Sequence, residues 1–170
     1  MKRLFLSMLV ALMALASWAV NNDQYTIIVS LDGFRWDYCE AYNTPFLNSM
    51  AEKGVKAVMS PSFPSKTFPN HYTLATGLVP DHHGIIANSF RIRSTGKKYS
   101  LGNAETRSDT RNYGGDPIWL TAKRQGMTTA TVYWVGSDIP IKGGYANYWQ
   151  DYQKKPLLTD VERADEVVRL

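Results

Sequence analysis

The order of strand-like and helix-like segments is the feature that most constrains how this chain can fold. Short runs rich in β-branched residues predict strands at residues 25–31, 55–59 and 128–135. Patterns typical of helices lie at residues 44–55, 70–77, 116–125 and 161–170. Strands that alternate with helices in this way predict an α/β fold with a largely parallel sheet.

Local signals define the ends of two of these helices. In the helix at 44–55, Thr44 is a plausible N-cap and Pro45 falls at the first helical position. In the helix at 116–125, Asp116 and Pro117 take the same two places, and Gly126 follows its end. Between these helices, residues 88–101 resemble a hairpin that turns at Thr95-Gly96, and residues 136–156 read as a loop rich in glycine and tyrosine.

Chemistry-bearing residues follow the first predicted strand. Asp32 ends the run TIIVSL, and ligands of α/β proteins collect at the carboxyl ends of strands. It could be a metal ligand, a phosphoenzyme nucleophile, or a helix cap or turn former. The nucleophile interpretation is weakened because the usual second aspartate, two residues on, is replaced by Phe34.

The stretch PSFPSKTFPNHYTLATGLVPDHHG, residues 61–84, contains all three histidines of the chain. Thr67 lies in its proline-rich part, just before a predicted helix, where its hydroxyl could be an N-cap. The same position favours binding of a phosphate or a developing anion, and a metal ion near Asp32 would activate the hydroxyl. We interpret His71 as a structural histidine rather than a base or a metal ligand, and Asp81-His82-His83 as part of a turn rather than a metal site.

The amino terminus has the form of a secretory signal. Two basic residues precede an apolar run at residues 4–16, and Ser17 and Ala19 give a small-x-small cleavage pattern. We expect cleavage after Ala19, a periplasmic or secreted protein, and no stable membrane span afterwards; a retained anchor helix is the alternative.

Charge and cysteine content narrow the class further. The formal net charge of +4 includes the basic residues of the leader, and no arginine-rich stripe follows, which argues against a nucleic-acid scaffold role. A single cysteine, Cys39, excludes an internal disulfide.

Several motifs together resemble one enzyme family. They are SLDGFRWDY, NTPFLNSMAEKGV, PSFPSKTFPNHYTLATGLVPDHHGIIANSF, GGDPIWLTAKRQG and YWVGSD. With these, the chain is similar over about residues 25–170 to the nucleotide pyrophosphatase/phosphodiesterase family of the alkaline phosphatase superfamily. The resemblance implies an alkaline-phosphatase-like α/β fold with helices on both faces of the sheet. It also implies an extracytoplasmic enzyme that uses two zinc ions to split phosphodiester or pyrophosphate bonds of nucleotides or other small phosphodiesters.

The resemblance also implies roles for individual residues. Thr67 would be the nucleophile that forms a covalent nucleotidyl intermediate, and it would share with Asp32 the zinc ion that activates it. Asn88, preceded by Ala87 where the family usually has glycine, would bind a phosphoryl oxygen together with the Thr67 amide. Phe68 would pack against the nucleobase or leaving group.

A tyrosine of the later loop would complete the sandwich around the base. We expect it to be Tyr148, with Tyr145 and Tyr152 as alternatives.

One departure from the family pattern is large. The family's zinc sites need two further aspartates and three histidines from the second half of its domain, and those segments are absent from this sequence. We therefore expect residues 20–170 to be the N-terminal portion of a catalytic domain, inactive alone. Alternatives on the same scaffold are a lipid-headgroup phosphodiesterase, a phosphonate hydrolase or a non-catalytic exported remnant.

Overall fold

A computed structural model describes residues 24–151 and 156–170 of the chain. The predicted leader, residues 1–19, lies outside these described residues. The chain divides into two units, residues 1–30 and 31–170, and every helix and strand given below lies in the second unit.

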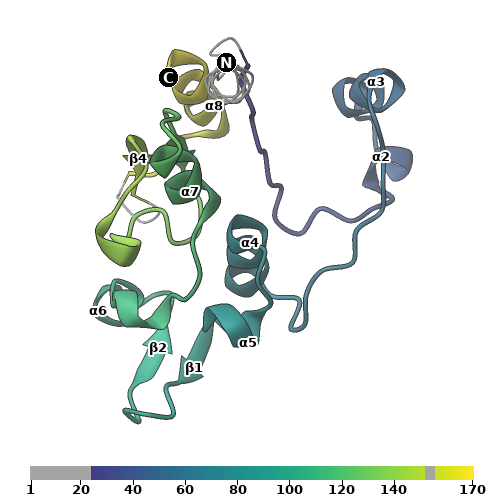
Figure 1. The fold of residues 1–170 in the computed structure, drawn as a ribbon. Coiled ribbons are helices and arrows are strands. Elements are labelled where there is room, and N and C mark those ends of the chain that lie inside the picture. Colours follow the sequence, from purple (N-terminus) through teal and green to yellow (C-terminus); the bar gives the residue numbers. More distant parts are fainter. Residues whose placement is uncertain (1–23, 152–155) are drawn as a thin grey trace, which may run out of the picture. The chain divides into compact units, whose positions relative to one another are not determined.

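Short elements follow one another along the second unit (Figure 1). The helices are α2 (Tyr38–Ala41), α3 (Pro45–Lys53), α4 (Thr67–Thr76), α5 (Pro80–His83), α6 (Ala104–Arg107), α7 (Ile118–Arg124) and α8 (Asp160–Arg169). Two 3-10 helices are η1 (Thr110–Asn112) and η2 (Ile141–Gly143). The strands are β1 (Ser89–Arg91), β2 (Lys98–Ser100), β3 (Ala130–Val132) and β4 (Tyr148–Gln150).

The four helices predicted from sequence are all present, with shifted ends. Pro45 is the first residue of α3 and Gly54 caps its C-terminus, although the Thr44 side chain makes no capping hydrogen bond. α7 begins one residue later than predicted, at Ile118, because Pro117 has an extended backbone and is itself the N-cap. Asp116 does not cap the helix, and its carboxylate pairs with Arg124 and Lys142 instead.

α4 begins earlier than predicted. Its first residue is Thr67, so the helix includes Pro69 as its third residue. A proline is tolerated there because the first N–H groups of a helix have no partner within the helix. Gly77 ends α4 with a positive φ of 69°, the left-handed conformation that glycine adopts without strain. The nucleophile candidate is therefore part of the helix, not of the loop before it.

Two predicted strands are wrong for the described residues. Residues 25–31 and 55–59 have no strand, and their side chains are open to solvent, with Tyr25 at 89% and Val55 at 95% exposure. A strand forms only when a neighbouring strand accepts and donates its backbone hydrogen bonds. No strand of the described residues pairs with either segment, so a high β propensity is not sufficient to order them.

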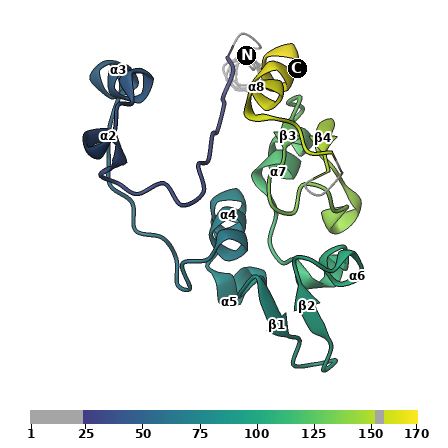
Figure 2. The ribbon, with the colours of Figure 1, turned by 180° about the vertical axis from the view of Figure 1, so that it is seen from behind.

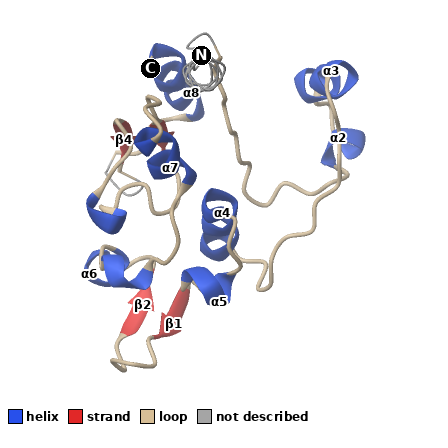
Figure 3. Cartoon of the chain, viewed as in Figure 1, coloured by secondary structure: helices blue, strands red, loops and turns tan. Residues whose placement is uncertain are grey.

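The strands that do form make two separate pairs (Figures 2 and 3). The predicted hairpin is confirmed: β1 and β2 pair antiparallel, with Phe90 opposite Tyr99, and Gly96 has a positive φ in the turn. β3 is a short part of the strand predicted at 128–135. It pairs in parallel with β4, which lies in the segment predicted to be a loop, and Thr131 faces Trp149 in this register.

Aromatic side chains make up much of the core of the second unit. Tyr72 of α4 is fully buried, packs edge-to-face on Tyr113 and donates a hydrogen bond to the Gly114 carbonyl at 3.0 Å. Tyr99 of β2 is also buried, and its hydroxyl lies 2.9 Å from that of Tyr113. These contacts link α4, the hairpin and the chain before α7.

No helix within residues 24–151 and 156–170 combines the length and the apolar character needed to cross a bilayer.

Candidate functional site

Thr67 and Asp32, which are 35 residues apart, are in direct contact. The Thr67 Oγ1 donates a hydrogen bond to Oδ2 of Asp32 at 3.1 Å. Thr67 is half-buried at the first position of α4, whereas Asp32 is exposed in the turn that follows residues 25–31. A carboxylate that accepts from the hydroxyl holds this hydroxyl in one orientation at a helix N-terminus.

Asn88 contacts the same helix start. Its Oδ1 accepts a hydrogen bond from the Phe68 backbone N–H at 3.1 Å. The N–H of Leu101 bonds to the Asn88 carbonyl at 3.0 Å, so the backbone of Asn88 is fixed by the base of the hairpin. Because Oδ1 accepts from Phe68, the amide group is oriented and its NH₂ faces away from that bond. The structure thus brings Asp32, Thr67 and Asn88 to the first turn of α4.

Phe68 contributes its backbone rather than its ring to this arrangement. The side chain is only 2% exposed and belongs to the core with Tyr72 and Ile85. An aromatic ring in this position stabilises the helix start by burial, and it does not present an open face to solvent.

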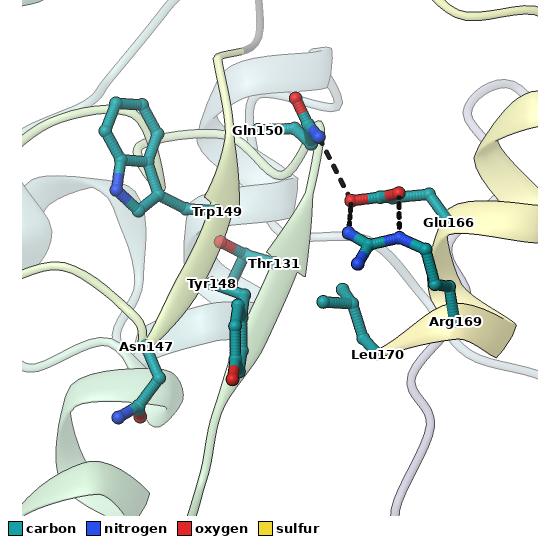
Figure 4. Close-up of a pocket in the computed structure, with 8 residues that line it drawn as sticks. All are labelled: Thr131, Asn147, Tyr148, Trp149, Gln150, Glu166, Arg169 and Leu170. Atoms are coloured by element: carbon teal, nitrogen blue, oxygen red, sulfur yellow. Dashed lines mark hydrogen bonds and ion pairs between the residues drawn. The ribbon is translucent and has the colours of Figure 1, made fainter.

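Tyr148 lies in a different part of the unit. It is 51% exposed in β4 and lines a hollow of about 320 Å³ between β3, β4 and α8 (Figure 4). In that hollow Glu166 accepts from Gln150 at 3.2 Å and pairs with Arg169. Among the described residues that line it, none comes from residues 61–76 or from residues 31–37.

The alternative tyrosines are placed differently. Tyr145 stacks on Trp149, with ring centroids 4.6 Å apart. Tyr152 lies outside the described residues. The structure therefore does not bring an exposed tyrosine into contact with Thr67 among the residues it describes.

The histidines have structural contacts. His71 donates from Nδ1 to the Thr67 carbonyl at 2.8 Å, and its own carbonyl accepts from the Trp134 indole N–H at 3.1 Å. His83 is fully buried; its Nδ1 accepts from the Ile85 N–H at 3.2 Å. Nε2 therefore carries the hydrogen and donates to Thr73 at 3.0 Å. Burial holds the pKa of His83 below its ordinary value.

A buried ion pair was missed by the sequence reasoning. Arg107 of α6 lies 3.4 Å from Asp138, and their side chains are only 7% and 4% exposed. Burial raises the pKa of Asp138, while the Arg107 guanidinium opposes this shift. Among the residues that the structure describes, the Arg107 Nε has no hydrogen-bond partner. The sequence gives a weak signal for it, an aspartate shortly after the strand residues TVYWV.

The donor set for a metal ion is partial. The Asp32 carboxylate and the Thr67 hydroxyl offer two oxygen donors on one side of the helix start. Within the described residues there is no group of three or more His, Cys, Asp or Glu side chains that could hold a metal ion. Zinc sites in proteins use three or four protein ligands, so these residues fit one part of a zinc site and do not complete it.

Comparison with known proteins defines the class of the chain. The profile of the family described as type I phosphodiesterase / nucleotide pyrophosphatase matches residues 26–169. The chain belongs to this family. Its fold class is therefore the alkaline-phosphatase-like α/β fold, of which the described residues form an incomplete part.

Individual relatives agree with this assignment. Ectonucleotide pyrophosphatase/phosphodiesterase family member 3 of Rattus norvegicus is 41% identical over 129 residues, which is 74% of this chain and 15% of the rat protein. Venom phosphodiesterase 2 of Crotalus adamanteus is 40% identical over 131 residues, 75% of this chain and 16% of the venom protein.

Solved structures of murine ectonucleotide pyrophosphatase/phosphodiesterase 5 superpose well. One has a TM-score of 0.77 and 33% identity, and it covers 86% of this chain and 39% of the murine chain. An inactive form of the same murine protein, solved in complex with AMP, has a TM-score of 0.78 and 32% identity over the same shares. The chain thus spans less than half the length of the proteins to which it is similar.

Proposed function

We propose that the chain is the N-terminal portion of an exported enzyme that hydrolyses phosphodiester or pyrophosphate bonds of nucleotides or nucleotide derivatives. The observation that carries this proposal is the contact between Thr67 and Asp32 at the start of α4, with Asn88 bonded to the next residue. The inactive murine relative that binds AMP supports a nucleotide as the substrate class.

In this proposal Thr67 is the nucleophile. A neutral threonine hydroxyl is a weak nucleophile, and it needs a base or a metal ion that lowers its pKa. The Asp32 carboxylate holds the hydroxyl in place, and the helix N-terminus favours the negative charge of a phosphoryl group there. Zinc bound in part by Asp32 and Thr67 would supply this activation, and the remaining ligands would come from outside the described residues.

Asn88 has the second role. Its NH₂, oriented by the bond from the Phe68 N–H to Oδ1, would donate to a phosphoryl oxygen, as would the Thr67 backbone N–H. A neutral amide suits a diester, which carries less charge than a monoester. Tyr148 remains the proposed aromatic for the organic group of the substrate, although the described residues place its exposed ring in the hollow beside α8 and not at Thr67. Phe68 would support the site from the core.

The test begins with the coding DNA beyond codon 170 and uses the product of the complete reading frame beside the 170-residue chain. We expect the complete product to cleave a nitrophenyl nucleotide ester, and the 170-residue chain to be inactive. Nitrophenyl-phosphocholine in parallel separates the nucleotide enzyme from a lipid-headgroup phosphodiesterase. A stop codon directly after Leu170, with no activity from the product, would contradict the catalytic proposal.

Substitution of the nucleophile gives the sharper result. Thr67→Ala in the complete product should lower kcat by at least about 10³-fold, as loss of a nucleophile does in other hydrolases. Thr95→Ala, at the exposed hairpin turn, is the matched control and should retain activity. Retained activity in Thr67→Ala would remove this residue from the nucleophile role.

Export is a separate part of the proposal. Relatives are described as ectonucleotide enzymes or venom enzymes, which agrees with the leader at residues 1–19. Amino-terminal sequencing of the protein recovered outside the cytoplasm should begin at residue 20. A product that keeps residues 1–19 would contradict cleavage and favour an anchor.

A further inference from the structure

The Asn70 side chain makes an unusual number of contacts with the loop that precedes Thr67. Its Nδ2 lies 3.3 Å from the Ser62 carbonyl, 3.0 Å from the Pro64 carbonyl and 3.0 Å from the Lys66 carbonyl. Its Oδ1 accepts from the Ser62 backbone N–H at 2.7 Å. One half-buried amide group thus contacts three residues of a five-residue stretch.

These contacts use both hydrogen-bond donors and the acceptor oxygen of the Asn70 side chain. An asparagine amide has two N–H donors, which are shared here among three carbonyl oxygens, while its oxygen serves as the acceptor. Regular backbone pairing is restricted in this loop, since Pro61 and Pro64 have no N–H to donate. Lys66 N–H does bond to the Pro64 carbonyl at 2.8 Å. The Asn70 side chain therefore supplies the hydrogen bonds that hold the rest of the loop in one conformation.

The Lys66 carbonyl connects this arrangement to the candidate nucleophile. That carbonyl belongs to the same peptide group as the Thr67 N–H, and peptide groups are planar. The oxygen accepts from both the side chain of Asn70 and its backbone N–H, the latter at 3.1 Å. Fixing this oxygen fixes the direction of the Thr67 N–H and the position of its Cα, from which the hydroxyl reaches Asp32.

We propose that Asn70 is a positioning residue for the reaction: its amide holds residues 62–66 so that the Thr67 hydroxyl and N–H meet the phosphoryl group in the reactive geometry. This inference rests on the proposed function of Thr67. Asn70 itself does not contact substrate, and it acts through the Lys66–Thr67 peptide. Small displacements of a reacting group lower the rate far more than they lower binding.

The experiment uses the complete enzyme and compares Asn70→Ala with Asn112→Ala. The control removes a similar bond, from Asn112 Nδ2 to the Thr106 carbonyl at 2.9 Å, in a segment remote in sequence from Thr67. We expect Asn70→Ala to lower kcat by roughly 10- to 100-fold while KM changes less than about twofold. Asn112→Ala should lower the melting temperature and leave kcat unchanged.

A second variant, Asn70→Asp, keeps the size of the side chain and its acceptor for the Ser62 N–H. It loses the amide donors, and its carboxylate faces three carbonyl oxygens, which disfavours ionisation. Protonation restores one donor, so the kcat of this variant relative to the unmodified enzyme should rise as the pH is lowered. If Asn70→Ala fails to fold, the pH dependence of Asn70→Asp tests the positioning role of Asn70.

The outcomes separate the two proposals. The positioning role is overturned if folded Asn70→Ala has an unchanged kcat, or if the kcat ratio of Asn70→Asp to the unmodified enzyme does not vary with pH. In either case an inactive Thr67→Ala still supports Thr67 as the nucleophile. An active Thr67→Ala overturns the proposed function, and the role of Asn70 with it.

Discussion

At the scale of single residues, the short stretch between Pro61 and Gly84 contains side chains with very different environments. Thr67 is half-buried and reaches an exposed carboxylate, Asn70 is engaged with the loop, and His83 is fully buried with both ring nitrogens bonded. Residue type and spacing pointed to Thr67 and Asp32, because an aspartate at a strand end and a hydroxyl before a helix have known chemistry. Residue type and spacing did not point to Asn70, because its role depends on how residues 62–66, a loop without regular backbone pairing, fold against its side chain.

The buried state of His83 has a consequence for stability. Its pKa in the folded chain lies below the ordinary value of 6.5, so the unfolded chain binds this proton more readily. The free energy of unfolding should therefore fall as the pH is lowered from about 7.5 to about 5.5. Urea unfolding at several pH values measures this dependence.

Two histidine variants identify its source. His83→Gln should flatten the pH dependence, whereas His82→Gln, which changes an exposed neighbour, should leave it as it is. An equal slope in all three proteins would show that His83 does not titrate differently in the folded chain.

The buried pair of Arg107 and Asp138 should also contribute to stability. Arg107→Ala leaves a carboxylate buried without its partner, which should lower the free energy of unfolding by about 3–5 kcal/mol. Asp138→Asn in the same background should recover part of this loss. Arg111→Ala, which breaks the exposed pair with Asp109, should cost far less than Arg107→Ala in urea unfolding. Similar losses for the two arginine variants would contradict the importance of burial.

At the scale of elements, the longer helices could be predicted from the sequence, whereas strand pairing between distant segments could not. The ends of α3 and α4 depend on nearby residues such as Pro45, Gly54 and Gly77. The hairpin could also be predicted, because its turn at Gly96 and its paired strands are close in sequence. A strand such as residues 25–31 depends on partners far along the chain, and the described residues do not supply them. The pairing of β3 with β4 was missed for the same reason.

The last helix, α8, begins with a capping box formed by Thr159 and Glu162, whose contribution to stability can be tested. Thr159 accepts from the Glu162 N–H, and the Glu162 carboxylate accepts from the Thr159 N–H, which completes a capping box. These bonds also hold the pKa of Glu162 below its usual range. Thr159→Ala should destabilise the helix by about 1 kcal/mol, and Thr159→Ser by less, as measured by circular dichroism during thermal unfolding. Equal stability of both variants would contradict a capping role for the hydroxyl.

At the scale of the whole molecule, the described residues form only part of the candidate site. Asp32 is exposed, two oxygen donors are present, and the proteins to which the chain is similar are several times longer. Large apolar side chains such as Val29 and Val55 are also open to solvent, which is typical of surfaces that another part of a protein covers. We propose that sequence beyond these residues covers them and completes the zinc sites.

Zinc titration tests this proposal directly. The 170-residue chain should show no saturable site at micromolar zinc in calorimetry, because two donors do not hold the ion against water. The product of the complete reading frame should bind two ions per chain, and Asp32→Ala should weaken one of them. Tight stoichiometric binding by the 170-residue chain would show that its own residues complete a site.

The β1–β2 hairpin provides a position for a fluorescent reporter of ligand binding. The backbone N–H of Leu101 donates to the Asn88 carbonyl at the base of the hairpin. The turn at Gly96, at the far end, is exposed and does not belong to the hydrophobic core. Exposed turns of this kind accept insertions. A fluorescent amino acid inserted beside Thr95 would therefore be joined to the candidate phosphate-binding amide of Asn88 by one short ladder of hydrogen bonds, and it would report ligand binding without touching the ligand.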